Sequence, residues 1–128
     1  MFTRGVRGAT TIQNDQAENV LAATRELLEA IQSANPTMRP EDVASAWFTV
    51  TQDIHSVYPA KAARLMGWTQ VPLMCSNEIS VPGGLPLCIR VLLHWNTDLP
   101  QAAIRHVYLH DAVTLRPDLA ATPASQVR

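Results

Sequence analysis

The segment from Leu87 to Thr97, LCIRVLLHWNT, most constrains how this chain can fold. Its residues alternate between the two faces of an extended strand. One face carries Ile89, Val91, Leu93 and Trp95, and the other carries Cys88, Arg90, Leu92 and His94. The first face predicts contact with a hydrophobic core, whereas Arg90 on the second is costly to desolvate unless an anion or hydrogen-bonding partner meets its guanidinium. We therefore expect Arg90 to lie in a half-enclosed anion-binding site.

Two helices are predicted, one long and one short. Asp15 and Glu18 resemble a capping box, and the apolar residues that follow recur at helical spacing until Asn35-Pro36 ends the pattern. The second helix is expected over 58–66, YPAKAARLM, with Gly67 at its C-cap.

Four more strands are predicted besides the one at 87–97. They are expected over 3–12, 43–51, 68–74 and 105–113. The 43–51 segment is apolar on both faces and predicts a buried central strand, whereas Pro72 restricts the 68–74 strand to a sheet edge or an irregular position. Because the strands alternate with only two helices, the pattern predicts an α+β fold with a mixed β-sheet, or a small barrel-like sheet, rather than a doubly wound fold.

The length of 128 residues suits one domain. We expect this domain over 1–115, because the tail over 116–128 is rich in Ala, Thr, Pro and Ser, lacks periodicity and predicts a mobile segment. Only 16% of the residues are charged and 47% are hydrophobic, whereas an ordinary soluble domain has about 25% charged residues. This composition favours burial of surface against other subunits, and it leaves open a monomer with an unusually apolar surface.

The basic residues indicate what kind of partner the protein binds. Nine of the ten are arginine and Lys61 is the only lysine, which favours planar, bidentate recognition of a small carboxylated or phosphorylated ligand. Nucleic acid fits poorly, because the net charge is -1 and the pI is about 6.4. Two arginines interrupt the first ten residues and no apolar run reaches about 18 residues, so we expect a cytoplasmic protein without a signal peptide or membrane contact.

Several catalytic classes lack their motifs in this sequence. There is no GxSxG and no HExxH, and Gly83-Gly84 belongs to a turn rather than to a phosphate-binding loop. Cys75 and Cys88 match no metal-site spacing, and a disulfide between them is not expected in a reducing compartment. What remains is a set of arginines with a tyrosine, a glutamate and a cysteine. Such a set suits binding and electrostatic stabilisation rather than covalent catalysis, and no metal is expected.

Four motifs, in unbroken order along nearly the whole chain, resemble the AroH class of chorismate mutases. They are RGVRGATT at Arg4–Thr11, YPAKAAR at Tyr58–Arg64, VPLMCSNEISVPGGLPLCIRV at Val71–Val91, and IRHVYL with LRPDL near the end. The resemblance implies a homotrimer of single catalytic domains that form a pseudo-α/β-barrel, with active sites in clefts between adjacent subunits. The implied reaction is the Claisen rearrangement of chorismate to prephenate, towards phenylalanine and tyrosine, which in this family needs no metal or organic cofactor.

The resemblance also implies roles for individual residues. Arg90 would stabilise the charge that grows on the ether oxygen and would contact the side-chain carboxylate, together with Arg7 and Tyr108. Glu78 and Cys75 would bind the ring hydroxyl, so the implied catalytic residues are Arg90, Glu78 and Arg7. Main-chain groups of Met74, Cys75, Ser76, Asn77 and Glu78 would shape the pocket, Tyr58, Ala60 and Leu115 would form its apolar wall, and Lys61, Arg64 and Arg116 would attract the dianion.

Two departures from the family pattern and two alternatives accompany this interpretation. Met74 stands where threonine is usual and Tyr58 where phenylalanine is usual, and neither change removes a required charge. An imine/enamine deaminase of the Rid type would also use an inter-subunit arginine, to hold a carboxylate while water attacks an imine. A non-catalytic trimeric ligand-binding protein is the other alternative. The grouping of Cys75, Glu78 and Arg90 favours the mutase.

Overall fold

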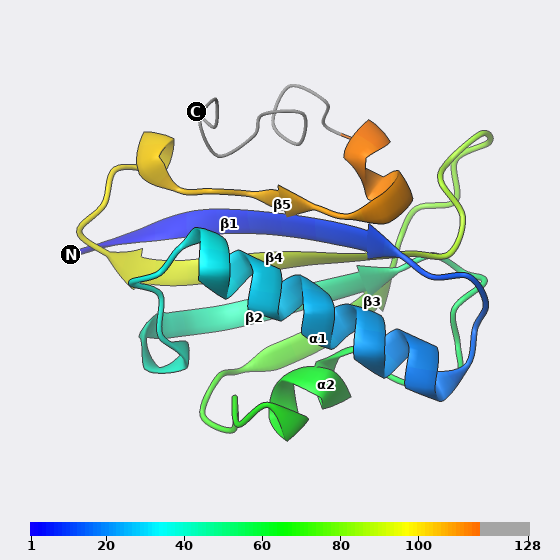
Figure 1. Cartoon of the computed structure of the whole chain (residues 1–128), viewed down its shortest axis with the longest axis horizontal. Helices are drawn as coiled ribbons and strands as arrows, with labels where there is room; N and C mark the ends of the chain where they lie inside the picture. Colours follow the sequence, from blue (N-terminus) through cyan, green and yellow to red (C-terminus); the bar gives the residue numbers. More distant parts are fainter. Residues whose placement is uncertain (116–128) are drawn as a thin grey trace.

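The computed structural model describes residues 1–115, which form a five-stranded mixed sheet with helices packed on it (Figure 1). The strands are β1 (Phe2–Thr11), β2 (Val43–Val50), β3 (Leu73–Asn77), β4 (Cys88–Thr97) and β5 (Val107–Tyr108). The helices are α1 (Ala17–Ala34) and α2 (Ala60–Leu65), with short 3-10 helices η1 (Pro40–Asp42), η2 (Gln101–Ala103) and η3 (His110–Thr114). The strand order is β3-β2-β4-β1-β5, with β4 antiparallel to both neighbours and the two outer pairs parallel. The predicted α+β fold with a mixed sheet is therefore confirmed.

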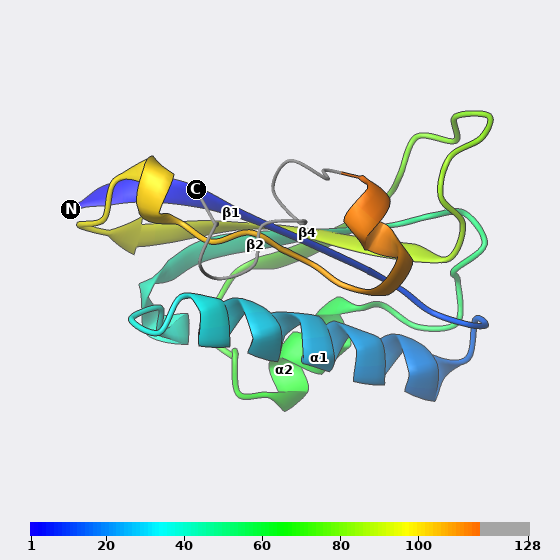
Figure 2. The same ribbon diagram turned by 45° about the horizontal axis from the view of Figure 1, so that its top comes forward.

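The two faces of the sheet are covered differently. Helices α1 and α2 lie on one face, called here the helix side, whereas the loop over 78–87 and η3 lie on the other, called the open side (Figure 2). The main core fills the helix side, and its largest buried side chains are Trp68, Trp95, Phe48, Leu27, Leu28 and Ile31. A smaller cluster of Ala9, Cys88, Tyr108 and Ala112 lies on the open side beneath η3.

Strand β4 lies at the centre of the sheet and keeps the predicted alternation. Its core-facing residues Ile89, Val91, Leu93 and Trp95 are all buried. On the open side, Arg90 is partly exposed, as expected for a half-enclosed layer. Cys88 is fully buried on this side, because the cluster under η3 covers it.

The edge strand lies farther along the chain than predicted, over Leu73–Asn77 rather than 68–74. The N–H of Ala46 donates to the carbonyl of Pro72, so pairing with β2 starts only there. Trp68 instead packs in the core before the strand begins. The predicted edge position is confirmed, and the segment from Met74 to Asn77 is part of the strand itself.

Strand β2 is an interior strand, as predicted, but the expectation that it is buried on both faces is wrong. Phe48 is buried on the helix side, whereas Trp47 is exposed on the open side. An apolar residue on a strand does not by itself show whether something covers it.

The last strand is much shorter than the predicted 105–113. Only Val107–Tyr108 pair with β1, and His110 then adopts a φ of +54° as η3 begins. Beyond this pair, side chains hydrogen-bond to the edge of β1: the N–H of Arg7 donates to Nδ1 of His106 at 3.0 Å. The side-chain amide of Gln101 likewise pairs with both backbone groups of Gly5. Residue alternation cannot distinguish such side-chain pairing from a continuous strand.

Helix α1 begins without the predicted capping box. Its N-cap is Gln16, and no side-chain hydrogen bond caps it. The carboxylate of Asp15 instead accepts hydrogen bonds from the N–H groups of His55 at 3.0 Å and Ser56 at 3.3 Å, in the connection that leads to α2.

Within residues 1–115, no helix is long and apolar enough to cross a membrane. The same residues contain no group of three His, Cys, Asp or Glu side chains arranged to hold a metal ion. Cys75 and Cys88 are both free thiols.

Gly8 allows α1 to pack closely against the sheet. A Cβ at Gly8 would lie 2.7 Å from Cδ1 of Ile31 and 3.2 Å from Cδ1 of Leu27. Because a packed core resists added volume, we expect Gly8→Ala to lower the free energy of unfolding by about 1–3 kcal/mol in urea denaturation. Gly5→Ala is the matched control, because its Cβ would meet only Leu92 at 3.8 Å. Equal losses in the two variants would contradict the close-packing explanation.

The contacts of Asp15 make stability depend on pH in acid. Hydrogen bonds from the Ser56 side chain and the His55 backbone lower the pKa of the Asp15 carboxyl below its ordinary value of 3.8. A lowered pKa in the folded state stabilises the protein above pH 3.8, and this contribution is lost as the pH falls through the folded pKa. We therefore expect Asp15→Asn to melt below the wild type at pH 7, with the difference shrinking below pH 3.8. A difference in melting temperature that stays constant across this range would argue against the assignment.

Candidate active site

Five of the predicted site residues lie in two neighbouring cross-strand rows on the open side of the sheet: Met74, Arg7, Ser76, Arg90 and Tyr108. Read from β3 to β1, the first row is Met74, Trp47, Leu92 and Arg7. Read from β3 to β5, the second row is Ser76, Thr49, Arg90, Ala9 and Tyr108. Residues opposite one another on paired strands point to the same face. The sheet therefore brings together side chains that are up to about a hundred positions apart in the sequence.

Arg90 and Glu78 form the charged centre of this site. Nε of Arg90 lies 3.3 Å from Oε2 of Glu78, and the two side chains are 31% and 27% exposed. The contact is an ion pair by distance, but the Nε–H is not aligned with the carboxylate. This buried nitrogen has no hydrogen-bond partner among residues 1–115. The side chain as a whole is partly exposed and lines a hollow, so the other N–H groups of the guanidinium can meet a bound oxygen.

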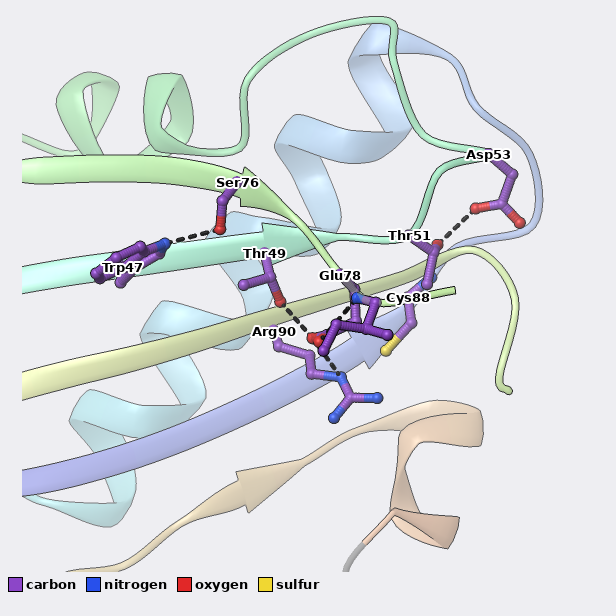
Figure 3. A network of polar contacts seen from close by, with 9 residues as sticks. Trp47, Thr49, Thr51, Asp53, Ser76, Glu78, Cys88 and Arg90 are labelled. Carbon is purple, nitrogen blue, oxygen red and sulfur yellow. Dashed lines mark hydrogen bonds and ion pairs between the residues drawn. The ribbon is translucent and has the colours of Figure 1, made fainter. Parts of the chain in front are cut away.

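The carboxylate of Glu78 is held by its surroundings. The hydroxyl of Thr49 donates to Oε2 at 2.9 Å, and the backbone N–H of Glu78 donates to the carbonyl of Val50 at 2.8 Å. Figure 3 shows Thr49, Glu78 and Arg90 converging from three strands or strand ends, with the sulfur of Cys88 beside the guanidinium. These contacts orient the Glu78 carboxylate beside the Arg90 guanidinium before any ligand binds.

Arg7, Tyr108 and Leu115 extend the site towards η3. The guanidinium carbon of Arg7 lies 5.8 Å from the centre of the Tyr108 ring, a cation–π contact. Tyr108 is buried in the cluster under η3, and Leu115 packs against that cluster. Tyr108 and Leu115 therefore lie on the side of the sheet that carries Arg90.

Two hollows meet at Arg90 and Glu78. One, of about 450 Å³, is lined by the predicted residues Arg7, Ser76, Asn77, Glu78 and Arg90, together with Thr49. The other, of about 520 Å³, extends from Arg90 under the loop over 79–86. Their volumes lie in the range of small-molecule sites. Two arginines and one carboxylate suit an anionic ligand that also carries a hydrogen-bond donor.

The side chain of Cys75 does not converge with the Glu78 carboxylate within one chain. Cys75 pairs with the buried Phe48, so its thiol points to the helix side and packs against the core. The carbonyl of Pro72 and the N–H of Glu78 bond to β2, which by the parallel pattern leaves the backbone groups of Cys75 facing the free edge of β3. Any contact of Cys75 with a ligand near Glu78 would therefore use its main chain.

Neither cysteine is an activated nucleophile. Burial raises the pKa of the Cys75 thiol, and the N–H of Ala60 opposes this only in part. Burial also raises the pKa of the Cys88 thiol, against the opposing effect of the neighbouring Arg90. Both thiols are therefore protonated at neutral pH, so the site has no thiolate.

A second set of predicted residues lies on the helix side and is called here the α2 group. It consists of Tyr58, Ala60, Lys61 and Arg64. Tyr58 is exposed in a hollow of about 510 Å³ that it shares with Cys75, Ala60 is buried, and Lys61 and Arg64 are exposed on α2. Within one chain this group is on the opposite side of β3 from Arg90. Arg116 and the predicted mobile tail lie outside the described residues.

Sequence reasoning missed Trp47 and Thr49. Thr49 orients Glu78, and Nε1–H of Trp47 donates to the hydroxyl of Ser76 at 2.8 Å. Both belong to the strand that was expected to be buried on both faces. The signal that could have found them is the alternation of Trp47 and Thr49 with Ala46 and Phe48.

Comparisons with known proteins agree with this fold. A family model described as chorismate mutase type I matches residues 3–119. The chain is 49% identical over 128 residues to chorismate mutase AroH of Bacillus subtilis, covering 99% of this chain and 100% of that protein. It is 53% identical over 118 residues to chorismate mutase AroH of Thermus thermophilus, covering 92% and 97%. A solved chorismate mutase from Clostridium thermocellum aligns with a TM-score of 0.84 and 46% identity, over 86% of this chain and 97% of that one. On these grounds the chain belongs to the type I chorismate mutase family.

Proposed function

We propose that this protein catalyses the rearrangement of chorismate to prephenate, the reaction named by its family. The observation that carries the proposal is the Arg90 guanidinium. It lies beside Glu78, stays partly exposed and lines a hollow whose volume suits a small dianion. Neither a Rid-type deaminase nor a non-catalytic binding protein is favoured by the comparisons.

The chemistry needs a fixed cation more than any other group. The ether C–O bond breaks ahead of C–C bond formation, so negative charge grows on the ether oxygen. A cation positioned there stabilises the transition state more than the ground state, and one such donor contributes roughly 3 kcal/mol. We assign this role to Arg90. No nucleophile or proton transfer is required, which agrees with the protonated thiols of Cys75 and Cys88.

The remaining polar groups bind and fold the substrate. Arg7 and Tyr108 are assigned to the side-chain carboxylate together with Arg90, and Glu78 is assigned to the ring hydroxyl. Thr49 donates to Oε2 of Glu78 and the N–H of Ile79 donates to Oε1 at 3.3 Å, so each carboxylate oxygen keeps a further lone pair that can accept from that hydroxyl. Main-chain groups at the free edge of β3 would line the same pocket.

We also propose that three copies assemble and complete the sites between them. Trp47, Met74 and Leu92 are 46%, 60% and 38% exposed in one row on the open side, a contiguous apolar surface that favours contact with another subunit. The α2 group lies across β3 from Arg90, so a ligand at Arg90 would reach that group only on a neighbouring copy.

The proposed reaction is tested by following the loss of the ultraviolet absorbance of chorismate. We expect turnover by the wild type, and a fall in kcat of about 10²- to 10³-fold in Arg90→Lys, because lysine keeps the charge but not the planar fork. Arg39→Lys is the control, since Arg39 is an exposed residue paired with Asp42 away from the site. Near-normal turnover by Arg90→Lys would show that charge alone suffices.

The shared sites are tested by mixing two variants that each lack one charged group of the proposed site. Arg90→Ala and Arg64→Ala proteins, unfolded and refolded together, should form sites that combine an intact Arg90 with an intact Arg64 from another chain. We expect activity above the average of the two variants refolded alone, in particles of three times the 14.1 kDa chain mass. Activity equal to the average of the two parents would place each site within one chain.

A further inference from the structure

Leu87, the residue immediately before β4, has an unusual backbone conformation. Its φ is +50°, in the left-handed region that side chains other than glycine rarely adopt. Arg90 follows three residues later. An observed backbone outlier next to a functional residue is a reason to ask what holds it there.

Asp53 holds the N–H of Leu87. This N–H donates to the two carboxylate oxygens of Asp53 at 3.0 and 3.2 Å. On the other side, the carbonyl of Leu87 accepts a hydrogen bond from the N–H of Ile12 at 3.0 Å. Both backbone groups of the strained residue are therefore tied, one to the segment after β2 and one to the end of β1.

Thr51 holds the next residue in the same way. The N–H of Cys88 donates to Oγ1 of Thr51 at 3.0 Å, and the carbonyl of Cys88 accepts from the N–H of Thr51 at 3.1 Å. The Thr51 hydroxyl in turn donates to Oδ1 of Asp53 at 2.5 Å. Figure 3 shows Asp53, Thr51, Cys88 and Arg90 in succession along this network.

The network leads to Cys88, two positions before Arg90 in the chain. Cys88 and Arg90 lie on the same face of β4, and Figure 3 shows the Cys88 sulfur beside the Arg90 guanidinium. The conformation at Leu87 sets the direction in which β4 starts. It therefore sets where the Arg90 side chain begins and where its charge can be placed.

We propose that Asp53 and Thr51 are positioning residues for Arg90, acting through the backbone of Leu87 and Cys88; this inference rests on the proposed mutase function. Asp53 lines the same hollow as Arg90, yet a carboxylate is a poor direct partner for a dianionic substrate. Its oxygens are already occupied by the N–H of Leu87 and the hydroxyl of Thr51. It therefore acts on the reaction through Arg90 and not by touching substrate.

The kinetic test compares two exposed aspartates. We expect Asp53→Ala to lower kcat about tenfold with KM changed less than about threefold, because small displacements of a catalytic group cost rate more than binding. Asp98→Ala is the matched control: Asp98 is exposed and contacts only the N-terminal amine in the ion pairs of residues 1–115, so its kcat should stay within about twofold. A kcat for Asp53→Ala equal to that of Asp98→Ala would overturn the proposal.

Two rescue experiments separate positioning from a general loss of structure. Glycine adopts positive φ without strain, so Leu87→Gly in the Asp53→Ala background should recover most of the lost kcat, measured against Leu87→Gly alone. Thr51→Ser keeps the hydroxyl and should retain activity, whereas the equally branched Thr51→Val should lose it. If Leu87→Gly recovers no activity and Thr51→Ser loses as much activity as Thr51→Val, Asp53 and Thr51 do not act through this turn.

A readout independent of activity uses the two thiols. Cys88 is fully buried at the start of β4, so loosening of this turn should expose it to an alkylating reagent. We expect Asp53→Ala to speed alkylation of Cys88 at least about fivefold, while Cys75 on β3 serves as the internal comparator in peptide mass spectra. Faster Cys88 labelling in a protein whose wild type does not turn over chorismate would reject the proposed function alone. Unchanged labelling together with unchanged kcat would reject the positioning role alone.

Discussion

The desolvation of Arg90 is the constraint on which the rest of the site depends. Its strand, β4, is the central strand, and the core needs the alternate residues Ile89 and Val91 buried. Arg90 must therefore face the open side, where it stays partly exposed and meets a carboxylate from Glu78. A charged arginine that is partly shielded from water interacts strongly with a bound anion, because water screens little of its electric field.

Small residues on β1 make this arrangement possible on both faces of the sheet. Gly8 points to the helix side, where it lets α1 pack against the strand at close range. Ala9 points to the open side directly opposite Arg90, and its short side chain leaves room for the guanidinium. The same strand therefore supports a tight core on one face and an anion site on the other.

Side chains that hydrogen-bond to backbone groups determine how the connections around the sheet are held. Asp53 and Thr51 hold the start of β4, Asp15 holds the connection before α2, and His106 bonds to β1 next to its pairing with β5. These contacts fix segments that have no regular pairing of their own, which reduces the freedom of the loops that border the site. A reaction that depends on one well-placed cation needs this kind of rigidity.

Local periodicity predicts the α+β class, helix α1 and the buried face of β4, and the cost of burying a charge predicts the anion-binding role expected of Arg90. These local patterns do not predict the shortness of β5, the position of β3, the exposure of Trp47 or the partners of Asp15. Most of these features depend on which distant group accepts a hydrogen bond from a given backbone N–H. His106 accepts from Arg7, Pro72 accepts from Ala46, and Asp15 accepts from His55. The pairing of Thr49 with Glu78, and the separation of Cys75 and the α2 group from Arg90 by β3, were likewise decided only by the tertiary structure. The physical reason is that strand register and sheet order, which no local pattern encodes, decide which side chains share a face.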